Sequence, residues 1–582
     1  MELKKAFIKR PRSIEGQWSP IVIEDVSPRI DEGSFAVKCT VGEKFIVEAD
    51  IFKEGHDVLD VALLFKKKSE AVWSQVPMRL MDNDRWQAFF IPMDNERYLY
   101  TVEAWASTHG PKTRYKHTLE LVADRKAAEF GAWYEFFPRS QGQVPGQTAT
   151  FKDCVARLPD IKKMGFDIVY LTPIHPIGLT NRKGPDNMLN PSDNSPGSPW
   201  AIGSQEGGHK AIHPQLGDFK EFKSFMEAAK DLGLEICLDV AFQCSPDHPY
   251  VKDHPQWFYH LPDGSIHYAE NPPKKYEDIY PLNFYCADWK NLWEELKSIV
   301  IFWIEKGINI FRVDNPHTKP LYFWKWLIDE IQKDHPQVIF LSEAFSRPKI
   351  MKFLAKAGFT QSYTYFTWRN SKQELQSYLQ ELINTDMRDY FRGNFFTNTP
   401  DILSEYLQKG GGPAFKIRFV LAATLSSSYG IYSGFELCEN QAEPDSEEYA
   451  NSEKYEIKTR DWDRPGHIKD FISRINAIRK GNLALQEYKN LEFYETLNEH
   501  MLCYGKRTVD NSNIMVVVVN LDPFAAHEDM VTLPLEKFGI KEGQVFGMHD
   551  LLTGAAYPWR GPSNYVRLDP FSNPAHIFLV NP

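Results

Sequence analysis

Between residues 131 and 435, short apolar runs alternate with amphipathic stretches, and this alternation constrains the fold more than any other feature of the chain. Strands that are joined in this way by helices lie parallel, and eight consecutive units close into a (β/α)8 barrel. The chain is therefore predicted to be an α/β protein built around a TIM barrel. The expected strands are 132–137, 167–172, 235–242, 308–313, 338–344, 359–366, 390–396 and 428–435, with helices expected at 153–164, 219–232, 289–306 and 321–333.

The flanking regions have a different pattern. Residues 1–125 contain short alternating runs, such as 44–52 and 98–105, which predict an immunoglobulin-like β-sandwich. After residue 490 the helices stop, and runs such as 515–521 predict a C-terminal β-sandwich over 490–582. The barrel then occupies 126–489, with an insertion at 245–286 after the third strand that is too long for an ordinary βα loop.

Charge and cysteine content exclude several classes of function. The chain has 67 basic and 78 acidic side chains, so its net charge of −11 disfavours partners that are nucleic acids or anionic membranes. Seven scattered cysteines form no Cys-x-x-Cys pair, which argues against a disulfide framework and for a reducing compartment. No apolar segment follows the basic N-terminal residues 1–10, and we expect a cytoplasmic protein. No nucleotide-binding glycine motif is present, so no cofactor is expected.

Three acidic residues leave the ends of predicted barrel strands. Asp314 follows the fourth strand, Glu343 the fifth and Asp401 the seventh, so the barrel would bring the three carboxylates to one face. Converging carboxylates are what glycoside chemistry needs: one attacks the anomeric carbon and a protonated second one serves as acid. Arg312, two residues before Asp314, would keep this nucleophile ionised.

This series of residues resembles the α-amylase superfamily of retaining glycosidases and transglycosidases, glycoside hydrolase family 13. The resemblance implies that Asp314 is the nucleophile, Glu343 the general acid and base, and Asp401 the transition-state stabiliser. Further motifs are similar to one branch, the bacterial α-1,4-glucan:maltose-1-phosphate maltosyltransferases. Two of them depart from the amylase pattern: Gln243-Cys244 after strand three and the lengthened Asn398-Thr-Pro-Asp401 near strand seven. The others are 133–140, 170–178, 206–214, 270–276 and 312–320.

The branch resemblance implies a retaining transferase that moves maltosyl units from α-maltose 1-phosphate to the non-reducing end of α-1,4-glucans or malto-oligosaccharides. It assigns Lys183 and Gln243 to the donor sugars, and it places four residues at the phosphate end: Asn271, Lys274, Tyr276 and Asn315. The cations and amides of the loops 181–187 and 271–276 agree with a phosphorylated donor, because a net-acidic protein must neutralise phosphate locally.

Two alternatives remain open on the sequence. One is an α-glucan hydrolase or glucosyl phosphorylase of the same superfamily, and the other is a catalytically inactive carbohydrate-binding subunit. No metal site is expected, because no histidine or carboxylate cluster has ligand spacing. The branch implies a homodimer, but its members carry a helical insertion in the N-terminal region, and this chain passes almost directly from residue 110 to residue 119.

Overall fold

The computed structural model describes residues 20–106, 112–189, 191 and 195–582. The basic N-terminal residues 1–10, and residues 107–111 at the start of the connection that lacks the expected insertion, lie outside the described residues. The chain divides after Asp124 into two compact units, each described by itself.

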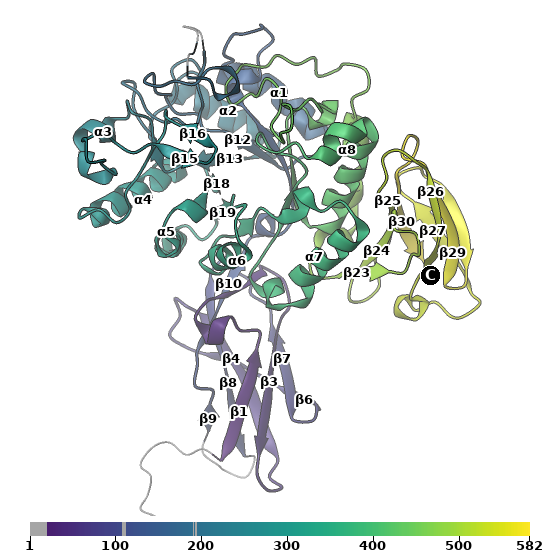
Figure 1. Ribbon diagram of the computed structural model, residues 1–582. Coiled ribbons are helices and arrows are strands. Elements are labelled where there is room, and N and C mark those ends of the chain that lie inside the picture. Colours follow the sequence, from purple (N-terminus) through teal and green to yellow (C-terminus); the bar gives the residue numbers. More distant parts are fainter. Residues whose placement is uncertain (1–19, 107–111, 190, 192–194) are drawn as a thin grey trace, which may run out of the picture. The chain divides into compact units, whose positions relative to one another are not determined.

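The first unit is a β-sandwich, as the alternating pattern predicts (Figure 1). One sheet has the strand order β1-β3-β7-β6, and the other has the order β2-β10-β8-β4-β5 with β9 paired to β8. Aromatic rings pack between them: the ring centroid of Phe45 lies 5.1 Å from that of Tyr100 and 5.4 Å from that of Phe90. The strands are β1 (Ile21–Ser27), β2 (Val37–Thr40), β3 (Phe45–Lys53), β4 (Leu59–Lys67), β5 (Ser74–Pro77), β6 (Arg79–Asp82), β7 (Arg85–Phe90), β8 (Arg97–Ala106), β9 (Thr113–Arg114) and β10 (Leu119–Asp124).

The second unit contains the predicted parallel barrel, which is confirmed. The strand order β20-β19-β18-β13-β12-β11-β22-β21 is closed by a parallel bridge between Ser362 and Gly393. The interior is packed with buried side chains such as Trp133, Tyr170 and Phe396, as the TIM-barrel fold requires. The strands are β11 (Gly131–Phe136), β12 (Ile168–Leu171), β13 (Glu235–Val240), β18 (Ile310–Val313), β19 (Ile339–Ser342), β20 (Gln361–Ser362), β21 (Asn394–Phe396) and β22 (Ser428–Tyr432).

Eight helices alternate with these strands and surround them (Figure 1). Several begin at a polar residue that satisfies their free amides: Thr150 and Asp153 form a capping box on α1, and Ser371 and Glu374 form one on α7. Each of these helices has buried apolar residues, and α8 is buried almost all round from Ala414 to Leu425. The helices are α1 (Phe151–Lys163), α2 (Phe219–Asp231), α4 (Trp289–Glu305), α5 (Leu321–Asp334), α6 (Pro348–Lys356), α7 (Lys372–Asn384), α8 (Glu405–Leu425) and α9 (Lys469–Gly481).

Long segments at the carboxyl ends of the strands build the rim of the barrel. The insertion after β13 contains α3 (Pro249–Asp253) and a hairpin of β15 (Ala269–Asn271) and β16 (Lys274–Tyr276). Its base is fixed by β14 (Gln243–Cys244), which pairs with β17 (Tyr280–Pro281). A second irregular segment, 438–467, follows β22 and precedes α9. Rim segments of this length usually carry a binding site.

A second β-sandwich follows the barrel, and its yellow strands lie beside α8 in Figure 1. The Tyr406 hydroxyl of α8 donates to the Leu521 carbonyl at 2.7 Å, and the Thr424 hydroxyl lies 2.6 Å from that of Tyr504. No helix among the described residues is long and apolar enough to cross a membrane. The strands are β23 (Leu491–Tyr494), β24 (Met501–Arg507), β25 (Ile514–Asn520), β26 (His527–Thr532), β27 (Val545–Asp550), β28 (Ala556–Arg560), β29 (Ser563–Leu568) and β30 (Ala575–Asn581).

Candidate active site

A cleft of about 670 Å³ opens at the carboxyl ends of the barrel strands. Its walls contain all three carboxylates that the sequence predicts to converge, Asp314, Glu343 and Asp401. Asp314 follows β18 directly, Glu343 follows β19 directly, and Asp401 lies in the turn after β21. Because parallel strands end at one edge of the barrel, residues 87 positions apart in sequence meet in a single cleft.

Arg312 contacts three carboxylates, those of Asp239, Asp314 and Glu343. Its guanidinium, which is 4% exposed, lies 2.9 Å from Asp314 Oδ1, 2.9 Å from Asp239 Oδ2 and 3.5 Å from Glu343 Oε1. Burial alone would lower the pKa of Arg312, but the surrounding acids raise it well above its usual value. Arg312 is therefore a permanent cation that contacts both Asp314 and Glu343.

Glu343 has the properties of a general acid. Burial, with a further contribution from the nearby Asp314 charge, raises the pKa of Glu343 to about 7, although Arg312 acts in the opposite direction. The backbone amide of Asn315, in the left-handed region with a φ of 44°, donates to Glu343 Oε2 at 3.0 Å. Glu343 is thus oriented by the turn that follows Asp314, and near neutral pH it exchanges a proton readily.

Asp401 has the opposite behaviour. Burial would raise its pKa, but the ammonium of Lys454 contacts its Oδ1 and lowers the pKa below the usual value. The two nearby acids therefore differ in charge at neutral pH: Glu343 is about half protonated at pH 7 and largely protonated below it, whereas Asp401 is ionised. Two carboxyl groups whose environments separate their pKa values in this way are typical of acid and base pairs in glycoside chemistry.

Most of the predicted donor-binding residues line the same cleft. Gln243 donates from Nε2 to the Trp200 carbonyl at 3.2 Å, and the β15–β16 hairpin carries Asn271, Lys274 and Tyr276. Asn315 also lines the cleft, with its Nδ2 at 3.4 Å from Asp314 Oδ2. The structure thus brings together two segments that are far apart in the sequence, the hairpin and the turn after β18.

Lys183 lies elsewhere. Its side chain is 2% exposed, its Nζ lies 2.5 Å from Glu277 Oε2, and it is not among the residues that line the cleft. Its charge acts on Asp278, which does line the cleft. Burial raises the pKa of Asp278 to about 6, and Lys183 limits that rise. Lys183 therefore supports the cleft wall electrostatically.

Sequence reasoning missed several residues that the cleft contains. Asp278 belongs to the residues that line the cleft, and neither oxygen of its buried carboxylate has a hydrogen-bond partner among the described residues. Lys454, Tyr455 and Glu448 come from the irregular segment 438–467, which has no periodicity or motif that would have identified them. Asp239 is not among the residues that line the cleft but contacts Arg312 at 2.9 Å, and it did carry a signal, since it is an acid within the apolar strand β13.

A different part of the molecule holds a histidine and carboxylate cluster. His500, Asp522 and His527 of the C-terminal sandwich place their ligand atoms within 4.8 Å of one another. His527 Nε2 lies 2.9 Å from Asp522 Oδ2, and Asp522 also accepts from the Phe524 amide. These residues are outside the cleft and are not connected with its chemistry.

Comparisons with known proteins agree with this geometry. Residues 19–125 match the family model described as "Alpha-1,4-glucan:maltose-1-phosphate maltosyltransferase, domain N/S", and residues 493–580 match "GLGE, C-terminal". The chain is 46% identical to the protein of that maltosyltransferase name from Myxococcus xanthus, over 96% of this chain and 97% of the relative. It is 44% identical to the protein of the same name from Chlorobaculum tepidum, over 99% and 98% of the two chains.

The first of these alignments runs over 646 positions, more than the 582 residues of this chain, so the relative contains segments with no counterpart here. Solved structures agree on the fold. An α-amylase from Lactobacillus plantarum has a TM-score of 0.60 at 19% identity, covering 78% of this chain and 100% of that one. A cyclomaltodextrinase has a TM-score of 0.61 at 16% identity, covering 95% and 98%.

The identity of the sequence over nearly its whole length and the carboxylate cleft in an amylase-like barrel lead to the same family. The chain belongs to the α-1,4-glucan:maltose-1-phosphate maltosyltransferases.

Proposed function

We propose that this enzyme transfers maltosyl units from α-maltose 1-phosphate to the non-reducing end of α-1,4-glucans, releases phosphate and retains the anomeric configuration. The observation that carries the proposal is the pairing of Asp314 with a raised-pKa Glu343 through Arg312. The cleft volume suits an oligosaccharide donor, and the amides and cations of its rim suit a phosphate. The family relatives supply the identity of the donor and acceptor.

In the first step, the Asp314 carboxylate attacks C1 of the donor while the bond from C1 to the phosphate oxygen breaks. Glu343 donates its proton to the departing phosphate oxygen and becomes a carboxylate. Arg312, which contacts both residues, stabilises the negative charge that moves between them. The product is a maltosyl ester on Asp314 with inverted configuration at C1.

In the second step, Glu343 removes the proton from the 4-hydroxyl of the terminal acceptor glucose. The acceptor oxygen attacks C1 from the face that phosphate left, and the bond from C1 to Asp314 breaks. Asp401, kept ionised by Lys454, stabilises the positive charge that develops on the sugar in both steps. Two inversions give net retention, and each turnover lengthens the glucan by one maltosyl unit.

Transfer rather than hydrolysis requires an acceptor site from which water is excluded. The cleft includes apolar side chains that favour sugar faces over water, and three of them come from the insertion and the strand before it: Phe242, Leu282 and Phe284. The insertion 245–286 is therefore proposed as the segment that favours the glucan acceptor over water.

Trapping the covalent intermediate tests this mechanism. In a Glu343→Ala variant, α-maltosyl fluoride has a leaving group that needs little acid assistance, so Asp314 should become esterified and deglycosylation should be slow. Intact-protein mass spectrometry should then show a gain of one maltosyl unit, and peptide mapping should place it on Asp314. The double variant with Asp314→Ala is the control. No adduct in the single variant, or an adduct on another residue, would contradict the assignment.

The remaining expectations concern organisation and location. We propose that residues 126–489 with the insertion form the catalytic domain, between sandwiches at 1–125 and 490–582. The seven cysteines are free and six of them are buried, which supports the proposed cytoplasmic location. The homodimer that the family resemblance implies is tested by sedimentation equilibrium, where a purely monomeric species would contradict it.

A further inference from the structure

Lys274, at the beginning of β16, is already neutralised by an acid of the same cleft. Its ammonium contacts Glu448 Oε1, which reaches it from the irregular segment 438–467 on the other side of the rim. We propose that Glu448 is a specificity-determining residue that occupies Lys274 in the free enzyme and is displaced by the phosphate of the donor. The inference rests on the proposed function, since it needs a phosphorylated donor.

The charges of the cleft show why a competing anion matters. Arg312 is shared by three carboxylates, and Lys454 is paired with Asp401. Lys319 donates to the backbone carbonyls of Asp314 and Asn315, both at 3.3 Å, and so belongs to the turn that holds the nucleophile. A donor phosphate carries about −1.5 to −2 charges at neutral pH, as phosphate monoesters do. It must therefore take a cation from an existing partner.

Lys274 is the cation that can change partners. The Lys454 side chain is only 12% exposed, and Asp401 is needed in its ionised form, so this pair stays closed. By contrast, the side chains of Lys274 and Glu448 are 42% and 27% exposed, and Lys274 is the one side-chain partner of the Glu448 carboxylate among the described residues. When phosphate takes Lys274, Glu448 can turn outward and be hydrated, which costs little for an exposed pair.

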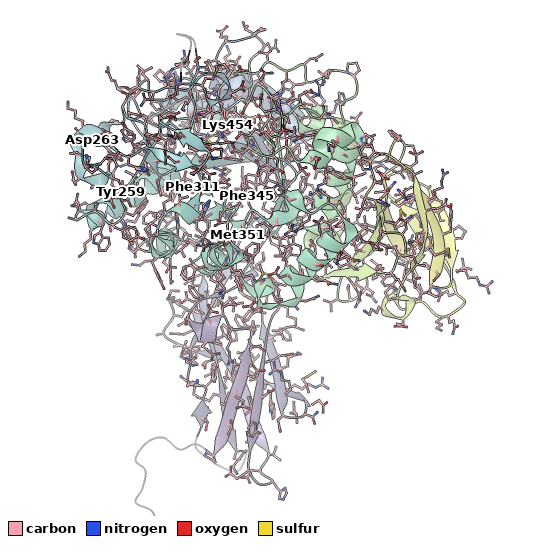
Figure 2. The ribbon with its side chains drawn as sticks, viewed as in Figure 1. Tyr259, Asp263, Phe311, Phe345, Met351 and Lys454 are labelled. Carbon is pink, nitrogen blue, oxygen red and sulfur yellow. The ribbon has the colours of Figure 1, made fainter. Side chains whose placement is uncertain are left out.

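Figure 2 labels Lys454 and Phe345, which line the cleft, and Tyr259 and Asp263 of the insertion, which are not among its lining residues. Lys274 and Glu448 line the same cleft as Lys454, so the exchange takes place within the cleft that holds the reacting groups. Once phosphate has left, Glu448 pairs again with Lys274. This disfavours rebinding of phosphate while the glucan acceptor attacks the maltosyl ester.

The test compares two donors in wild type and Glu448→Gln. Glutamine keeps the size of the side chain and removes its charge, so Lys274 becomes available to phosphate. We expect the KM for maltose 1-phosphate, and the inhibition constant of inorganic phosphate against α-maltosyl fluoride, each to fall about threefold to fivefold, the effect of losing one partly exposed ion pair. Kinetics with α-maltosyl fluoride alone should stay within about twofold.

The neighbouring Glu447 provides a matched control. Its carboxylate accepts from Trp368 Nε1 at 3.0 Å and does not contact Lys274, so Glu447→Gln should change neither constant. In a Lys274→Met background, Glu448→Gln should have no further effect on phosphate inhibition. Equal thermal midpoints of Glu448→Gln and wild type would show that the comparison is between folded enzymes.

An unchanged or weaker inhibition by phosphate in Glu448→Gln would overturn the proposal, because Glu448 would then not compete for Lys274. Failure of the proposed function gives a different result. In that case wild type would release no phosphate from maltose 1-phosphate with any malto-oligosaccharide acceptor, whatever residue stands at position 448.

Discussion

As the proposed general acid, Glu343 should set the pH range in which the enzyme works. The acid must be protonated when the donor binds, and its activity is lost as pH rises through its pKa, which burial raises to about 7. We predict that kcat/KM for maltose 1-phosphate falls above about pH 7, with a slope of one proton. Glu343→Gln should remove this limb and lower kcat/KM by at least about a hundredfold. Stopped assays of phosphate release between pH 5 and 9 measure both effects.

Lys454 lowers the pKa of Asp401, so replacing Lys454 should change the acidic limb of the pH profile of kcat/KM. Without this ammonium, burial would raise the pKa of Asp401, so its ionised form would be reached only at higher pH. We predict that Lys454→Met lowers kcat/KM by about a hundredfold relative to wild type at pH 6 and that this deficit relative to wild type becomes smaller toward pH 8. A pH profile with an unchanged acidic limb would show that Lys454 does not act through Asp401.

Among individual site residues, the sequence predicted those that directly follow regular strands and not those on irregular segments. Asp314 and Glu343 were predictable because each follows an apolar run whose end faces the site by topology. Lys454 and Glu448 were not, because segment 438–467 has no periodicity and its contacts with Asp401 and Lys274 span 53 and 174 residues. The ion pair of Lys183, which the resemblance assigns to the donor sugars, was not predictable because its partner Glu277 is 94 residues away.

Among the elements, the β-strands of the barrel leave little room for change near the site. A Cβ added to Gly430 in β22 would lie 2.4 Å from the Phe396 ring of β21. We predict that Gly430→Ala destabilises the protein by about 1–3 kcal/mol through overpacking. Gly481→Ala at the end of α9 is the control, because no atom lies within 4 Å of its added Cβ. Chemical denaturation measures both, and equal stabilities of the two variants would contradict the packing argument.

The rim beside β13 is held by a buried histidine cluster. His209 Nδ1 lies 3.1 Å from His248 Nε2, and His209 Nε2 lies 2.9 Å from the Ala241 carbonyl. Since His248 Nδ1 accepts from the Tyr250 amide, its Nε2 carries the proton donated to His209, whose own Nε2 proton is donated to Ala241. This order of donors requires both rings to be neutral.

Acid should therefore destabilise the fold by protonating buried histidine rings, among them His209 and His175. Burial lowers the pKa of His209 to about 4 and that of His175 to about 3, below the value near 6.5 of an unfolded chain. As pH falls, the unfolded state binds protons before the folded state does. The free energy of unfolding is therefore highest above about pH 6.5 and declines as pH falls toward 4. We predict a lower thermal midpoint at pH 5 than at pH 7, and a smaller difference in His175→Gln. If the difference in thermal midpoint between pH 5 and pH 7 were the same in His175→Gln as in wild type, His175 would not contribute to the acid sensitivity.

For the whole molecule, fold class followed from the sequence because eight strand and helix units permit few arrangements. The union of the barrel with the C-terminal sandwich did not follow, since it depends on contacts such as Lys372 Nζ with the Thr496 carbonyl at 2.7 Å, across 124 residues. We predict that a chain ending at residue 489 fails to form a cooperatively folding barrel. Calorimetry that showed an unchanged barrel transition would contradict this.

In the proposed mechanism, continued release of phosphate from the donor requires a glucan that accepts the maltosyl unit. We propose to measure phosphate release from maltose 1-phosphate with and without malto-oligosaccharides and to determine the lengths of the products. We expect release that depends on the acceptor, with products longer by two glucose units and no shortening of starch. Phosphate release that is independent of added glucan, or hydrolysis of starch without use of maltose 1-phosphate, would contradict it.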